Sequence, residues 1–276
     1  MTMPEEADAA VSSPDGVDAQ GVHSAALTDD HRFGDDYRRL TRYVGGADDP
    51  EEPADVLAMQ MVLRIEKASP PDRTELLTAA ARAVALLCLD DRAGGDGPWA
   101  APMDAWCDAR IRKISRRARA GQWAAAQEVW GVTAQSGDAQ ARAFVPGRVG
   151  EVDKRISRLQ IGGTDVDGEL PTAPEGPGIC LWVNPTLEMT VGKLAAQVGH
   201  ASMLAVRLLD AAAARRWRDA GCPLQVCQAD EAGWQRLLGA DATGQAIAVR
   251  DAGFTEIAPG SVTVIAENIA AREDFA

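Results

Sequence analysis

Strand and helix patterns alternate along the last hundred residues, and this alternation constrains the fold more than any other feature. Residues 179–183 form an apolar run with the length of a buried strand, and a long helical pattern follows over 190–218. Further elements are predicted as strands at 224–228, 246–249 and 262–266 and a helix at 230–238. The alternation favours a layered α/β fold, in which chemistry usually lies in the loops beyond the strand ends.

The preceding 178 residues divide by composition into three segments. Residues 1–50 are acidic, show no periodicity and are predicted to be a mostly disordered lead with a short helix near 37–43. Residues 51–161 are predicted to form a mainly α-helical accessory domain, with a possible β-hairpin over 129–145. Residues 162–178 are rich in Gly and Pro and are predicted to link this domain to a second one over 179–276.

The helices expected in the accessory domain have recognisable boundaries. The first begins near residue 53 and ends before Pro70, and the second starts at a capping box formed by Asp72 and Glu75. A third is predicted over 102–120, a shorter one after Gly121, and another short one within 149–160.

Charge and composition set limits on location and partners. The net charge of −13 is concentrated in residues 1–55, which carry −10, while residues 177–276 carry −3. The C-terminal part therefore offers few cations for phosphate contacts. The acidic N-terminus and the absence of an apolar run of about 18 residues predict a cytoplasmic protein without a membrane span. The five scattered cysteines predict reduced thiols and no zinc site.

Three short motifs stand in a fixed order near the C-terminus. They are Met-Thr-Val-Gly-Lys-Leu-Ala-Ala-Gln-Val-Gly-His-Ala at 189–201, Arg-Asp-Ala-Gly at 250–253 and Thr-Glu-Ile-Ala-Pro-Gly-Ser at 255–261. Together they resemble the type 2, or archaeal and eukaryotic, peptidyl-tRNA hydrolases over about residues 177–276. The resemblance implies a three-layer α/β domain with a mixed four-stranded sheet. It also implies a metal-free and cofactor-free hydrolase of the peptide–tRNA ester, a tRNA partner and a possible homodimer.

The residues of these motifs suggest chemistry on their own. Lys193 lies in the first turn of the predicted long helix, where free N–H groups attract anions, and Gly192 allows a close approach. Gln197 and His200 follow at spacings of four and seven and share its face. Asp251 follows a strand and could orient a water or a lysine for ester hydrolysis. Each also has a plain structural reading, as a solvated lysine, a structural histidine or a turn aspartate.

The resemblance assigns roles to particular residues. It implies a catalytic group made of Lys193, Asp251 and Thr255. It implies substrate-binding or positioning roles for Gln197, His200, Ser261 and Thr263. In the mechanism that follows, Asp251 activates a water and Lys193 stabilises the tetrahedral oxyanion.

Three positions depart from the family pattern. Val191 stands where the family has a first lysine, Phe254 where it has arginine and Glu256 where it has glutamine. These changes weaken the interaction with a polyanion. They favour an alternative in which a catalytically weakened domain acts as a tRNA-binding or regulatory module.

A basic cluster lies outside the motifs, between residues 110 and 119. On the predicted third helix, Arg112, Arg116 and Arg119 share one face, which is either a solvated helix surface or a tRNA contact. In the second interpretation, the accessory domain binds substrate through Arg112 and Arg116 and compensates for the acidic C-terminal domain.

Overall fold

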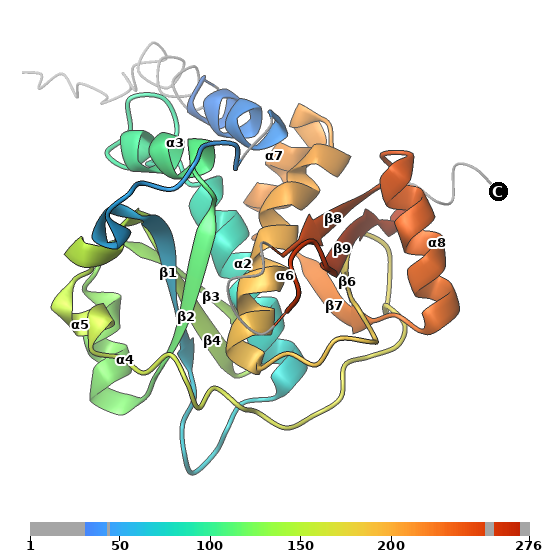
Figure 1. Ribbon diagram of the computed structural model, residues 1–276. Coiled ribbons are helices and arrows are strands. Elements are labelled where there is room, and N and C mark those ends of the chain that lie inside the picture. The colour runs from blue at the N-terminus through green and yellow to red at the C-terminus, as the bar shows by residue number, and fades with distance from the viewer. Residues whose placement is uncertain (1–30, 43–44, 252–256, 271–276) are drawn as a thin grey trace, which may run out of the picture.

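Two β-sheets face each other across a pair of central helices (Figure 1). The computed structural model describes residues 31–42, 45–251 and 257–270. The two central helices are α2 (Arg73–Cys88) and α6 (Val191–Leu204). Each helix packs against both sheets, so the two sheets share one continuous hydrophobic core.

The N-terminal sheet has the strand order β2-β1-β4-β3, and the short β5 also pairs with β1. Its strands are β1 (Leu57–Arg64), β2 (Arg112–Ala118), β3 (Gly131–Ser136), β4 (Ala139–Phe144) and β5 (Gly147–Arg148). The other elements of this half are α3 (Ala100–Asp108), α4 (Ala120–Gln127), α5 (Lys154–Ser157), η1 (Pro53–Asp55) and η2 (Val149–Glu151). The half that was predicted to be mainly helical thus has a sheet at its centre.

Two segments predicted as helices are strands. Residues 58–63 are buried on both faces of β1, and such a continuous apolar run cannot be distinguished from a buried helix by periodicity. The third predicted helix ends at Asp108, the backbone turns at Ile111 with a φ of 47°, and residues 112–118 pair with β1. The hairpin over 129–145 is confirmed as β3 and β4, and Asp72 caps α2 as predicted.

The C-terminal sheet confirms the predicted layers. Its order is β7-β6-β9-β8, formed by β6 (Ile179–Val183), β7 (Leu224–Gln228), β8 (Ala246–Arg250) and β9 (Val262–Asn268). The helices of this half are α6, α7 (Ala211–Asp219) and α8 (Glu231–Ala242), with η3 (Ala205–Leu208) after α6. One face of the sheet packs on α6 and the other on α8. The long helix predicted over 190–218 is interrupted, because Asp210 caps a new helix by accepting from the N–H of Ala213.

The two sheets have the same topology. In each, the first two strands in sequence are parallel, and the last two complete the sheet in antiparallel pairs. The central helices also start alike: Asp72 caps the N–H of Glu75, and Thr190 caps the N–H of Lys193. Glu75 therefore occupies the position in α2 that Lys193 occupies in α6.

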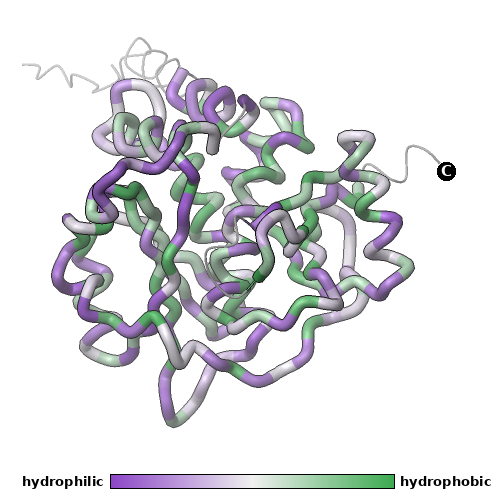
Figure 2. The backbone as a smooth tube through the Cα atoms, viewed as in Figure 1, coloured by the Kyte–Doolittle hydropathy of each residue, from purple (hydrophilic) through white to green (hydrophobic). Residues whose placement is uncertain are grey.

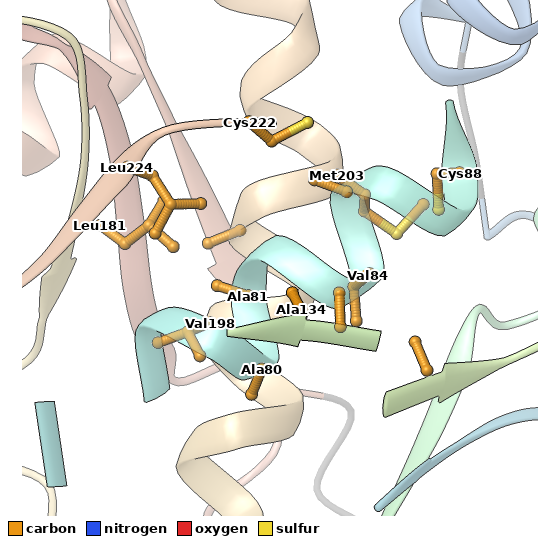
Figure 3. Close-up of a cluster of buried hydrophobic side chains, with 14 of the residues drawn as sticks. Ala80, Ala81, Val84, Cys88, Ala134, Leu181, Val198, Met203, Cys222 and Leu224 are labelled. Atoms are coloured by element: carbon orange, nitrogen blue, oxygen red, sulfur yellow. The ribbon is translucent and has the colours of Figure 1, made fainter. Parts of the chain in front are cut away.

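Small residues allow the central helices to pack closely (Figure 3). Ala80, Ala81 and Val84 of α2 point into a cluster that includes Val198 and Met203 of α6. A side chain at Gly199 would place its Cβ 2.9 Å from Val84 Cγ2, so glycine is required there. The contact joins the two halves of the chain through their cores.

Two further segments connect the halves. The helix over residues 31–41, which lies within the predicted disordered lead, binds both: Tyr37 Oη donates to Leu209 O, and Arg39 pairs with Asp104. Residues 162–178 contain no helix or strand, as expected for a linker, but Leu170 is buried against the core. All five cysteines are buried, and none of them forms a disulfide. No helix in the described part of the chain is both long and apolar enough to cross a bilayer.

Candidate active site

Four of the predicted site residues meet between α6 and the end of β8. Lys193 Nζ forms an ion pair with Asp251 Oδ2, and Gln197 Nε2 donates to the same oxygen at 2.8 Å. Thr263 Oγ1 on β9 donates to Gln197 Oε1 at 2.7 Å. The Asp251 and Lys193 side chains are only 6% and 13% exposed. The spacing of Lys193 and Gln197 on one helix face therefore brings both onto one carboxylate.

The start of α6 is fixed by two hydroxyl groups. Thr190 caps the helix, and Thr164 from the linker accepts a hydrogen bond from Gly192 N at 3.0 Å. A Cβ on Gly192 would lie 2.7 Å from Thr164 Oγ1, which explains the glycine. The group that approaches Gly192 closely is thus a side chain of the same chain, where the sequence suggested a phosphate.

The backbone around Asp251 directs its carboxylate inward. Asp251 N donates to Ser261 O at 2.9 Å, and Gly260 N donates to Asp251 O at 2.7 Å. The pairing of β8 with β9 shifts register between Val249 and Arg250, and Arg250 extends to Asp241 on the other side. Asp251 is consequently held at the edge of the sheet facing α6, with Ser261 beside it.

The hydrogen bonds also fix the orientation of the Gln197 amide. The Asp251 carboxylate can only accept, so the NH₂ group of Gln197 must face it, and the amide oxygen then accepts from the Thr263 hydroxyl. The reverse orientation would place two oxygens against each other. The carboxylate is thus held by a cation and an oriented amide in a largely water-excluded place, where electrostatic interactions are strong.

His200 lies on the same helix face but faces a different partner. Its Nδ1 lies 3.0 Å from Lys113 Nζ on β2. Burial, together with Lys113 and Lys193, holds the pKa of His200 well below its usual value, so the ring is neutral at pH 7. Since Lys113 occupies this side of the ring, the arrangement agrees with a positioning role for His200.

The structure does not bring Arg112 and Arg116 to this site. Both lie on the face of β2 turned away from α6, because alternate residues of a strand point to opposite sides. Arg112 pairs with Asp49, and Arg116 donates to Gln60 Oε1 at 2.9 Å and to Leu159 O at 2.8 Å. The prediction of one helix face shared with Arg119 is wrong, since the segment is a strand and Arg119 only caps α4.

Some predicted positions cannot be placed. Thr255, Phe254 and Glu256 lie outside the described residues. Val191 is described: it is buried in the core of α6, where no substrate can reach it. Among the described residues, no group of three or more His, Cys, Asp and Glu side chains is placed to hold a metal ion.

The N-terminal half lacks the equivalent groups. Glu75 stands in place of Lys193, and Ala79 holds the position of Gln197 in the corresponding helix. The long connection from β8 to β9 is reduced to a two-residue turn, Gly137 and Asp138, between β3 and β4. Glu75 accepts from Asp138 N at 3.3 Å across this turn. Within the residues that the structure describes, the polar site is assembled in the C-terminal half and not in the N-terminal one.

Comparison with known proteins also matches the C-terminal half, which contains the polar site. Residues 178–274 match the family model "Peptidyl-tRNA hydrolase PTH2". A peptidyl-tRNA hydrolase of Haloquadratum walsbyi is 40% identical over 83 residues, which cover 29% of this chain and 74% of the relative. The chain therefore belongs to the PTH2 family of peptidyl-tRNA hydrolases, and the resemblance of its motifs is confirmed.

Proposed function

We propose that this chain hydrolyses the ester between the peptide and the 3′-terminal ribose of peptidyl-tRNA. The observation that carries the proposal is the convergence of Lys193 and Gln197 on Asp251, with Thr263 bonded to Gln197, within the segment that matches the family. These four side chains come from α6, β9 and the end of β8, and all belong to one polar network.

The reaction adds water to the ester carbonyl and releases a peptide carboxylic acid and a free ribose hydroxyl. In the proposed mechanism, Asp251 accepts the proton of the attacking water, while Gln197 and Thr263 hold its orientation. Lys193 shares its ammonium between Asp251 and the tetrahedral oxyanion. Thr255 and Ser261 are proposed to contact substrate from the connection between β8 and β9.

For this substrate, the proposed partner is tRNA and the proposed site of action is the cytoplasm. The family relative carries the name peptidyl-tRNA hydrolase, and the proposed catalytic residues lie within residues 178–274, which match the family model. The reaction breaks the ester C–O bond and an O–H bond of water, and the polynucleotide serves as the leaving group.

A second candidate is a binding or regulatory module that no longer turns over substrate. It is favoured by Val191, which stands where the family has a first lysine and is buried in this chain. The start of α6 therefore lacks that cation. The Lys193–Asp251 pair favours the enzyme, because a module that only binds has no need of a carboxylate beside its polyanion.

The decisive experiment is release of peptide from a peptidyl-tRNA by the wild-type chain, Lys193→Ala and Asp251→Asn, with the exposed Lys154→Ala as a matched control. We expect each site variant to lower kcat/KM by about 10²–10³-fold, and the control to match wild type. Retained turnover in Asp251→Asn would exclude Asp251 as the base. Binding of tRNA without turnover in the wild type would support the module.

A further inference from the structure

The face of β2 that packs toward α6 has an unusual composition. Lys113, Ser115 and Arg117 alternate on this face, which follows from their pairing with Met59, Met61 and Leu63 in β1. Lys113 Nζ reaches α6 itself, where it lies 3.2 Å from Met203 Sδ. Figure 2 shows this strand as a largely hydrophilic segment beside the central helices.

The equivalent strand of the other half behaves differently. β7 is parallel to β6 as β2 is parallel to β1, and it packs on α2 as β2 packs on α6. It presents Leu224 and Val226 to that helix, and both are part of the apolar core. An inward strand face is usually apolar, so β2 is the exception.

The polar face of β2 lowers stability. Ser115 is 7% exposed, and within the described part of the chain its hydroxyl has no hydrogen-bond partner. Burial lowers the pKa of Lys113 to about 7. A contribution to stability therefore does not explain why Ser115 and Lys113 stand on this face. Residues that lower the stability of the fold in this way are typical of functional sites.

A shallow cavity of about 350 Å³ lies at the end of this face. It is lined by Arg117, Gln160, Ile161, Gly162 and Gly163. The Arg117 guanidinium donates to Gln160 Oε1 at 3.1 Å and lies against Gly163, where a Cβ would come within 3.1 Å of its carbon atom. The next residue, Thr164, accepts from Gly192 N. The cavity thus lies one residue along the chain from Thr164, whose hydroxyl contacts the start of α6.

We propose that this cavity is an anion subsite of the active site, in which Arg117 of the N-terminal half binds a phosphate near the 3′ end of the polynucleotide. The inference rests on the proposed function, because the ester must lie at Lys193 and Asp251. A guanidinium recognises phosphate with two parallel hydrogen bonds. Ile161 is 56% exposed and offers an apolar surface to the neighbouring ribose or base.

The distribution of charge also supports a phosphate contact made by the N-terminal half. Residues 177–276 carry a net charge of −3, so the catalytic segment has little positive charge of its own. Arg112 and Arg116 are held by internal partners on the opposite face of β2. Arg117 donates to Gln160 Oε1 and also lines a cavity open to solvent.

The test compares Arg117→Gln with Arg158→Gln, an exposed arginine on the C-cap of α5 that removes the same charge elsewhere. Two substrates are used: peptidyl-tRNA, and the same peptide esterified to adenosine, which has no phosphate. We expect Arg117→Gln to lower kcat/KM for peptidyl-tRNA about 10-fold at low salt and to reduce the salt slope by about 0.7–0.9. Hydrolysis of the adenosine ester and the behaviour of Arg158→Gln should match wild type.

The remaining outcomes overturn the proposal in distinct ways. An equal loss on both substrates would assign Arg117 a structural role through Gln160, and no loss on either would remove it from the site. If the wild type hydrolyses neither substrate, the proposed function fails by itself. The subsite is then judged by binding of an RNA hairpin with a 3′-CCA end: weaker binding by Arg117→Gln with a smaller salt slope supports it, and unchanged binding overturns it.

Discussion

The Lys193–Asp251 pair makes a prediction about stability that is separate from catalysis. Replacing Lys193 by Ala removes the cation that pairs with the Asp251 carboxylate, which is only 6% exposed. Removing one partner of a buried ion pair costs about 3–5 kcal/mol. Because Gln197 remains as a hydrogen-bond donor to this carboxylate, we expect the lower end, about 3 kcal/mol at pH 7. For a chain of this size, the loss corresponds to a fall in Tm of about 6 °C or more.

The assay is thermal and urea unfolding followed by circular dichroism at pH 7. Lys154→Ala removes an exposed lysine and should change stability by less than about 0.5 kcal/mol. A Lys193→Ala chain as stable as Lys154→Ala at pH 7 would refute the view that the pair is buried and charged.

Two further predictions concern residues at the interface of the halves. The folded chain resists protonation of Lys113, whose pKa falls from 10.5 to about 7. The wild type should therefore lose stability relative to Lys113→Met as pH falls from about 10 to 7, by on the order of 3 kcal/mol, with no further change below pH 7. A difference in unfolding free energy between the two chains that does not vary with pH would contradict this. Gly192→Ala should destabilise the chain by about 1–2 kcal/mol in urea unfolding, because the added Cβ meets Thr164. Gly239→Ala in α8, which has open space around it, should be neutral or stabilising. Equal effects of the two substitutions would contradict the steric argument.

The sequence predicted the C-terminal half well because its signals are local. The strand at 179–183, the cap at Thr190 and the spacing of Lys193 and Gln197 each follow from one stretch of residues. A common site for Lys193 and Asp251 was expected from the family motifs, and the structure pairs them, whereas the contact of Gln197 with Asp251 was not predicted. Their catalytic roles, and that of Thr255, stay predictions.

The N-terminal half was harder to predict because its signals are ambiguous or distant. β1 is buried on both faces and has no period, and the basic residues of β2 suit an exposed helix as well as a strand. The contact of Lys113 with His200 joins residues 87 positions apart. Thr164 lies in a segment without regular structure, where no local pattern marks it as the partner of Gly192. The shared topology of the two halves is visible only in the pairing of their strands.

The repetition of one topology within a single chain has a consequence for how the site can be tuned. In a symmetric homodimer, both copies of a strand carry the same side chains, so any change is imposed on both interfaces at once. Here the two copies are encoded separately. β7 keeps Leu224 and Val226 against α2, while β2 carries Lys113, Ser115 and Arg117 against α6. One interface can maintain the fold while the other is free to specialise, an asymmetry that identical subunits cannot encode.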